Sequence, residues 1–202
     1  MIGIVILNYF SHKKVHNLLA TIPLDKAKLV IVDNSNSIKE FNELIKVKRS
    51  DLEYIKANKN GGFSVGTNIG IKKLKSKCKG ILILNPDTLL SRNFLENLEK
   101  ISELEPNFCF SPAGYLLDGK TPWSLGGKFF WLRGRAEPTT KSNLMRKISF
   151  GTCACIYLSK KALDSVGFLD EDYFLGGEEW QLSLDLNRLR IPIYFIPFSK
   201  YR

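Results

Sequence analysis

Polar side chains that could bind a phosphate or a metal follow three apolar runs of the sequence. Asn8 and Asp33 come directly after two such runs, and the turn Asn85-Pro86-Asp87 comes after a third. Apolar runs of this length are typical of strands buried in a parallel sheet, and ligands bind beyond the carboxyl ends of such strands. A carboxylate there, such as Asp87, can hold Mg²⁺ or Mn²⁺ together with substrate phosphates. The alternative is that Asn85 or Asp87 only caps the turn.

A glycine-rich loop adds a fourth polar cluster. The segment from Asn60 to Gly70 reads NGGFSVGTNIG, and we expect it to follow a strand and to open a helix. Gly61 and Gly62 permit close approach of the backbone, and the N-terminus of a helix favours anions. The spacing matches neither the dinucleotide-binding motif nor the phosphate-binding loop of nucleoside triphosphatases. A plain turn followed by helix packing explains the glycines equally well.

Two adjacent carboxylates, Glu178 and Glu179, stand after Gly176-Gly177 at the start of a predicted helix. Consecutive helical residues point about 100° apart, so the two side chains need not do the same work. One could act as a general base while the other caps the helix or binds substrate. The alternative is a pair of acidic residues that only favours the helix N-terminus.

The charge of the chain favours an acidic partner. The formal net charge is +10, which suits nucleic acid, an anionic membrane surface or a phosphorylated substrate. We exclude nucleic acid because no nucleic-acid-binding motif occurs. The four cysteines, of which Cys153 and Cys155 form a C-x-C pair without a nearby histidine, are interpreted as free thiols. Two basic groups either face solvent or bind an anionic surface: Lys72, Lys73, Lys75, Lys77 and Lys79, and Lys128, Arg133, Arg135, Lys141, Arg146 and Lys147.

The order of the predicted elements indicates an α/β fold of one domain, residues 1–202. The first half alternates strands and helices, which favours a mostly parallel central sheet flanked by helices. In the second half, residues 118–147 read as a long loop or small hairpin, and a strand is expected at 148–158. A last strand is expected at 193–196, after the helix that contains the glutamate pair. No run of apolar residues is long enough to span a membrane.

The sequence resembles the inverting family-2 glycosyltransferases of GT-A fold, in particular their rhamnosyltransferase-like branch. The matching segments cover nearly the whole chain in the order of the family: VILNY, VDNSNS, NKNGGFSVGTNIGI, ILNPDT, FGTCACIYLSKKALDSVGFLDEDYFLGGEE and IYFIP. The resemblance implies a donor-binding half at about 1–110 and an acceptor-side half at about 111–202.

The resemblance also implies roles for individual residues. Asp33 is expected at the nucleobase with Asn8 beside it, and Asp87 at the metal that bridges the donor diphosphate. Glu179 is the first candidate for the general base and Glu178 the second. The remaining implied positions are the donor-pocket residues Asn60, Gly62, Asn68 and Asn85, and the acceptor-side residues Gly151, Thr152, Gly176 and Gly177.

The activity that the resemblance implies is transfer of a sugar, with inversion, from a nucleotide-diphosphate sugar. The expected cofactor is Mg²⁺ or Mn²⁺. The expected acceptor is a glycan or lipid-linked glycan of bacterial surface polysaccharide synthesis. The protein is expected in the cytoplasm, in peripheral contact with the anionic inner face of the cell membrane.

The sequence departs from the family pattern at several positions. Gln181 stands where the family has an aspartate, and Asp185 stands near the place of an arginine. Many members have a metal-binding histidine after the last strand, whereas His12 and His16 are both near the N-terminus. We therefore expect either a further C-terminal segment or a differently completed metal site. The alternatives are a degenerate nucleotide- or glycan-binding module of the same fold, and a sugar nucleotidyltransferase.

Overall fold

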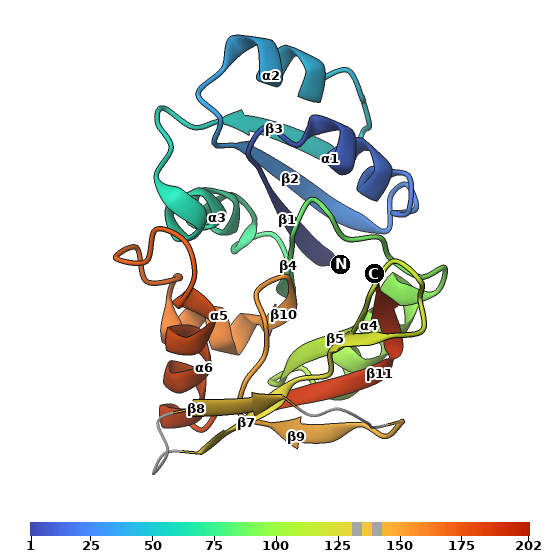
Figure 1. Ribbon diagram of the computed structural model, residues 1–202, viewed down its shortest axis with the longest axis vertical. Helices are drawn as coiled ribbons and strands as arrows, with labels where there is room; N and C mark the ends of the chain where they lie inside the picture. Colours follow the sequence, from blue (N-terminus) through green and yellow to red (C-terminus); the bar gives the residue numbers. More distant parts are fainter. Residues whose placement is uncertain (131–134, 139–142) are drawn as a thin grey trace.

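The main sheet of the computed structural model connects both halves of the chain (Figure 1). The structure describes residues 1–130, 135–138 and 143–202. Within these residues the strand order is β3-β2-β1-β4-β10-β5-β11-β9, with β6 paired to β5. The strands are β1 (Ile2–Asn8), β2 (Ala27–Asp33), β3 (Leu52–Lys56), β4 (Gly80–Leu84), β5 (Cys109–Tyr115), β6 (Pro122–Ser124), β9 (Arg146–Ile148), β10 (Cys155–Ser159) and β11 (Ile193–Tyr201).

The first four strands of this order form the predicted parallel sheet. β1 pairs in parallel with β2 and with β4, and β2 pairs in parallel with β3. The register places Asn8 opposite Asp33, so two of the predicted site residues end neighbouring strands. All five residues of β4 are buried, as expected for a strand covered on both faces.

The second half of the sheet is mixed. β10 lies antiparallel between β4 and β5, whereas β5 and β11 are parallel. The single strand expected at 148–158 is wrong, because residues 149–154 leave the sheet and separate β9 from β10. β9 pairs with β11 near one edge of the sheet, while β10 is in its centre, so the chain must cross between them. The last strand is longer than expected and its register shifts between Ile196 and Lys200.

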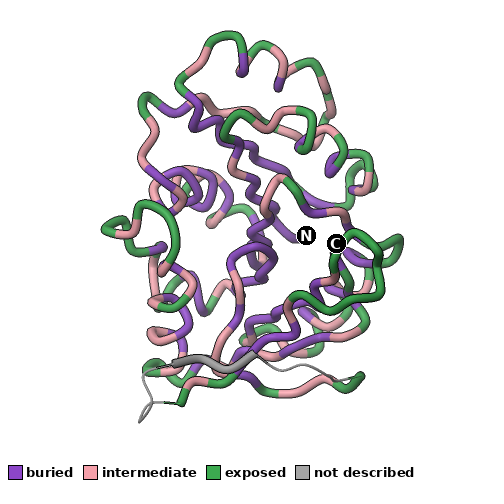
Figure 2. Tube along the Cα trace, viewed as in Figure 1, coloured by how far each residue is buried: buried purple, intermediate pink, exposed green. Residues whose placement is uncertain are grey.

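Helices cover both faces of the sheet, and one hydrophobic cluster lies beneath each layer. Figure 2 shows that the chain is largely buried along the central strands of the sheet. Successive residues of β1 alternate between the two clusters: Val5 belongs to one cluster, and Ile4 and Ile6 to the other. The cluster with Val5 contains residues of α3 (Gly62–Leu74), α5 (Lys160–Val166) and α6 (Glu178–Arg188). The other contains residues of α1 (His12–Leu19), α2 (Ile38–Leu44) and α4 (Phe94–Leu104).

The segment expected to be a loop or small hairpin contains short strands. After β6, the strands β7 (Gly127–Phe130) and β8 (Arg135–Pro138) form a separate antiparallel pair. A predicted basic group falls partly outside the described residues, since Arg133, Lys141 and the side chain of Arg135 are not described. The expectation of one domain with two functional halves stays a prediction.

Candidate active site

The carboxyl ends of the parallel strands meet segments from the second half of the chain. The amide of Asn85 donates to the carbonyl of Ala154 at 2.9 Å, which places the end of β4 beside the turn before β10. The amide of Leu89 donates to the carbonyl of Arg202 at 2.6 Å, which places the end of β11 at the same edge. Asp87 therefore lies between residues contributed by both halves of the sequence.

Asn8 and Asp33 form a buried polar network at the ends of β1 and β2. Both side chains are fully buried, and Asn8 Nδ2 donates to Asp33 Oδ1 at 2.9 Å and to Glu40 Oε1 at 3.1 Å. Ser35 Oγ donates to Asp33 Oδ2 at 2.9 Å. His12 Nδ1 lies 2.7 Å from Glu40 Oε2. Burial raises the pKa of Glu40, but hydrogen bonds from His12 and Asn8 outweigh it and leave this pKa below its ordinary value. The predicted nucleobase role of Asp33 would use a carboxylate fixed by these bonds.

Asn60 and Gly62 belong to the glycine-rich loop, which contacts the segment that precedes α6. Asn60 Oδ1 accepts from Asn34 Nδ2 at 2.8 Å and from the Gly62 amide at 3.0 Å. Gly62 has φ +83°, and a Cβ there would lie 2.7 Å from the Cα of Phe174, so only glycine fits. The next amide, of Phe63, donates to the Phe174 carbonyl at 2.6 Å. Backbone contacts thus connect the start of α3 to the loop that leads to the glutamate pair.

Asn68 uses its side chain for the same connection. It is fully buried, and its Nδ2 donates to the Leu169 carbonyl at 2.8 Å and to Glu171 Oε1 at 2.9 Å. Its Oδ1 accepts from the Leu169 amide at 2.9 Å. These three bonds hold Asn68 between α3 and residues 169–171. The place in the donor pocket that the resemblance implies for Asn68 stays a prediction.

Glu178 and Glu179 differ sharply in environment, as their positions on a helix predict. Glu178 is 6 % exposed, whereas Glu179 is half-buried. Among the described residues, Glu178 Oε2 has no hydrogen-bond partner. Burial raises the pKa of Glu178, and the adjacent Glu179 raises it further, despite hydrogen bonds from backbone amides. Gly177 precedes the pair with φ +99°, where a Cβ would lie 2.6 Å from the ring of Tyr173.

The turn at residues 151–154 lies between the glutamate pair and Asp87. Buried Gly151 donates its amide to Ser183 Oγ of α6 at 3.3 Å, and Thr152 Oγ1 accepts from the Ala154 amide at 3.2 Å. Cys153 is 3 % exposed; burial raises its pKa well above the ordinary value, and the nearby carboxylates of Glu179 and Glu178 raise it further. All four cysteines are buried free thiols.

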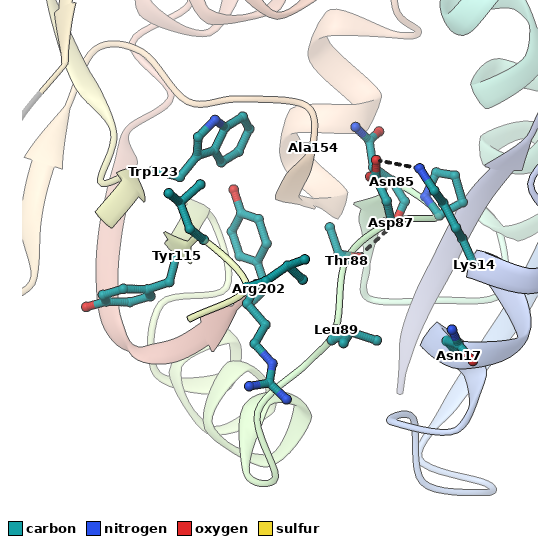
Figure 3. Close-up of a pocket in the computed structure, with 14 residues that line it drawn as sticks. Lys14, Asn17, Asn85, Asp87, Thr88, Leu89, Tyr115, Trp123, Ala154 and Arg202 are labelled. Carbon is teal, nitrogen blue, oxygen red and sulfur yellow. Dashed lines mark hydrogen bonds and ion pairs between the residues drawn. The ribbon is translucent and has the colours of Figure 1, made fainter. Parts of the chain in front are cut away.

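A cavity of about 580 Å³ opens beside Asp87 (Figure 3). Asp87 is exposed, and its Oδ2 lies 3.5 Å from Lys14 Nζ. No sequence motif marks Lys14 or Trp123, which both line this cavity. The one available signal is a tryptophan within a polar, glycine-containing segment. The lining residues are Lys14, Asn17, Asn85, Pro86, Asp87, Thr88, Leu89, Tyr115, Leu116, Leu117, Trp123, Ala154, Tyr201 and Arg202.

The side-chain oxygens of Asp87 and Asn85 fit a divalent cation that is shared with substrate. No group of three or more His, Cys, Asp or Glu side chains able to hold a metal occurs in the part of the chain that the structure describes. Asp87 supplies one exposed carboxylate, and Asn85 next to it supplies an amide. One or two carboxylates completed by phosphate oxygens and water is the usual protein environment of Mg²⁺. The residues present therefore fit a metal held jointly with a diphosphate.

The lysine group of α3 and the turn after it is largely paired within the protein. Lys72 and Lys75 lie over the ring of Phe168, with Nζ 5.0 and 5.4 Å from its centroid. Ion pairs join Lys73 to Glu53 at 2.6 Å, Lys75 to Asp164 at 3.4 Å and Lys79 to Glu103 at 2.8 Å. This pairing favours the interpretation as a solvated, ion-paired surface. None of the described helices has the length and apolar character needed to cross a membrane.

Comparison with solved structures supports the GT-A fold. GalNAc-T7 with UDP, GalNAc and Mn²⁺ superposes with a TM-score of 0.78 at 14 % identity, over 100 % of this chain and 43 % of that chain. The first 349 residues of S. aureus TarS superpose with a TM-score of 0.71 at 15 % identity, over 98 % of this chain and 59 % of that chain. The mannosyltransferase PcManGT of Pyrobaculum calidifontis, with GDP-Man and Mn²⁺, gives 0.71 at 12 % identity, over 98 % and 56 %.

Comparison of sequences gives the family. A hexosyltransferase of low-salt glycan biosynthesis in Haloferax volcanii, Agl10, is 26 % identical over 198 residues, which are 95 % of this chain and 63 % of that protein. The chain thus spans less than two thirds of this relative. Residues 11–167 match the family model described as glycosyl transferase family 2. Since this match extends over most of the sequence and the sheet has the GT-A arrangement, the chain belongs to glycosyl transferase family 2.

Proposed function

We propose that this chain transfers a sugar from a nucleotide-diphosphate sugar to a glycan or lipid-linked acceptor, with inversion of configuration. The observation that carries the proposal is the position of residues 151–154. Ala154 lines the cavity that contains Asp87, and the amide of Gly151 donates to Ser183 of α6, the helix that begins with the glutamate pair. A group able to hold a diphosphate through a metal and a group able to accept a proton thus flank one short turn.

In this mechanism Glu179 takes the proton of the acceptor hydroxyl, which attacks the anomeric carbon from the face opposite the diphosphate. Its half-buried carboxylate can reach substrate, whereas the Glu178 oxygen without a partner is enclosed by protein. The hydroxyl oxygen forms the new glycosidic bond as the bond to the diphosphate oxygen breaks. A divalent cation bound at Asp87 would offset the negative charge that develops on the leaving diphosphate.

The donor side of the proposal rests on the resemblance and on what the neighbours bind. Asp33, Asn60 and Gly62 lie at the carboxyl edge of β2 and at the start of α3, where a nucleotide binds in sheets of this type. Two of the neighbouring structures contain a nucleotide with Mn²⁺: UDP in one and GDP-Man in the other. Mg²⁺ or Mn²⁺ is therefore the proposed metal. The motifs alone support the rhamnosyltransferase-like branch and bacterial surface polysaccharide synthesis.

Peripheral contact with an anionic membrane at the cytoplasmic face completes the proposal. Its support is the net charge of +10, since a polybasic surface attracts anionic lipids. The ion pairs of the lysine group lower the number of charges that are free for this contact. Sedimentation with anionic vesicles at low and high salt tests it, because charge-driven binding weakens as salt rises. Binding that is absent at low salt, or that salt leaves unchanged, would remove the membrane from the proposal.

The decisive test is calorimetry of nucleoside diphosphates with Mn²⁺ on the wild type and on Asp87→Asn. Uridine, thymidine and guanosine diphosphates should be compared because the base is not defined. The wild type is expected to bind one of them in a metal-dependent manner, and Asp87→Asn is expected to abolish the metal dependence. Unchanged affinity in the variant would refute the metal role of Asp87. Metal-dependent binding without hydrolysis or transfer of the corresponding sugar nucleotide would favour the alternative of a non-catalytic binding module.

A further inference from the structure

The cavity beside Asp87 has two chemically different walls. One wall carries the polar side chains of Lys14, Asn85 and Asp87, which can donate and accept hydrogen bonds. Trp123 belongs to the other, with the apolar side chains of Leu116 and Leu117 next to it in the lining. Figure 3 shows Trp123 across the cavity from the polar side chains. The volume of about 580 Å³ lies inside the range of small-molecule sites, roughly 300–1,000 Å³.

Trp123 is exposed and yet held in place. Its side chain is 53 % exposed, and its ring meets that of Tyr201 edge to face, with centroids 6.3 Å apart. Gly114 on the neighbouring strand leaves room for the indole: a Cβ there would lie 3.1 Å from Trp123 Cε3. An aromatic ring fixed in this way loses little conformational entropy when a ligand stacks on it.

A pyranose ring matches the two walls, because one face presents C–H groups and its edge presents hydroxyls. We infer that this cavity is a subsite for a pyranose of the acceptor, which stacks on Trp123 and directs hydroxyls toward Lys14 and Asn85. The assignment of this pyranose to the acceptor rests on the proposed function. Trp123 belongs to the second half of the chain, whereas the expected nucleotide contacts are at the ends of β1 and β2. The donor and the acceptor pyranose therefore approach Asp87 from different segments.

Nuclear magnetic resonance of the tryptophan indole N–H signals tests the inference. The probes are methyl glycosides of glucose, galactose, mannose and N-acetylglucosamine, added with and without nucleoside diphosphate and Mg²⁺. The chain has three tryptophans, so Trp123→Phe and Trp180→Phe are used to assign these two signals. The signal of Trp180 serves as an internal reference near the glutamate pair. At least one glycoside is expected to shift the Trp123 signal and to leave that of Trp180 in place.

Two substitutions separate stacking from general loss of structure. Trp123→Ala is expected to weaken glycoside binding about tenfold, because the variant loses the apolar area that the face of a pyranose buries against the indole. Phe198→Ala is the matched control, because Phe198 is 41 % exposed and does not line the cavity. Both variants should keep metal-dependent binding of the nucleoside diphosphate.

The outcomes distinguish this inference from the proposed function. Glycoside binding that depends on Trp123, in a protein that binds no nucleotide, would support the pyranose subsite and refute the transferase. Nucleotide binding without any glycoside effect at Trp123 would overturn the subsite alone. If Trp123→Ala weakens a nucleotide sugar but neither the free nucleotide nor the glycosides, the ring that stacks there belongs to the donor, and the assignment to the acceptor is wrong.

Discussion

The buried carboxyl group of Glu178 should lower the stability of the folded protein at neutral pH. Its side chain is 6 % exposed and one oxygen has no partner among the described residues. A buried polar atom left unpaired costs about 1–3 kcal/mol. Glu178→Gln removes the charge but keeps a polar amide, so we expect the lower end of that range, about 1 kcal/mol. In a domain of this size that corresponds to a melting temperature raised by about 2–4 °C.

The difference in stability between Glu178→Gln and the wild type should depend on pH. The pKa of Glu178 in the folded protein lies above its ordinary value of 4.5. At pH values between the pKa of the unfolded state and that of the folded state, the folded protein binds more protons than the unfolded one. Its stability therefore falls as the pH rises through this range. Glu178→Gln has no such proton to lose. Its advantage over the wild type should be full above the folded-state pKa and should vanish below the unfolded one.

Thermal or urea unfolding of both proteins at several pH values between 4 and 8 measures the difference directly. Glu179→Gln is the matched control, because Glu179 carries the same charge on the next residue and is only half-buried. A Glu178→Gln protein that is less stable than the wild type at pH 8, or a difference independent of pH, would refute the account. The first result would show that the carboxylate is paired and charged in solution.

Three further outcomes follow from the site. Glu179→Gln should leave nucleotide affinity nearly unchanged and lower the transfer rate by about 10²–10⁴-fold. If this variant keeps the turnover of the wild type, the general base is another residue. Gly62→Ala should cost about 2 kcal/mol for its left-handed backbone, with a further loss from contact with the neighbouring loop. Gly176→Ala, with φ +81° and open space around it, measures the cost of the positive φ alone, and equal losses of unfolding free energy in the two variants would contradict the close contact at Gly62. Lys14→Met should raise Mn²⁺ affinity in calorimetry by no more than about fivefold, because its exposed ion pair with Asp87 is weak; lower affinity would show that Lys14 supports the metal.

The parallel part of the fold could be predicted because its signals are local. The buried strands at the N-terminus and before Asn85 are continuous apolar runs, and each is followed by a helical pattern. The break between β9 and β10 could not be predicted from the apolar run around it. Ile148 and Ile156 are both buried, but they belong to different strands of the sheet, and only tertiary pairing decides where the chain leaves one for the other.

The sequence indicates which candidate site residues follow the ends of strands, but not which residues they contact. Asn8, Asp33 and Asp87 were found because strand ends are visible in sequence. The bonds of Asn68 to Leu169 span a sequence separation of 101 residues, so no local pattern indicates them. Lys14 carries no motif, and its distance from Asp87 follows from how α1 packs beside the end of β4.

The contact between the start of α3 and the loop before α6 has a consequence for how this sequence can change over evolution. Its shortest link joins the amide of Phe63 to the carbonyl of Phe174, and neither group depends on the identity of a side chain. The side chains of Phe174 and Leu175 are 56 % and 78 % exposed. Substitutions at this tip can therefore alter what approaches the glutamates without changing the backbone contact that sets their distance from the glycine-rich loop. Gly62 is different, because at that position a side chain would meet the backbone of Phe174.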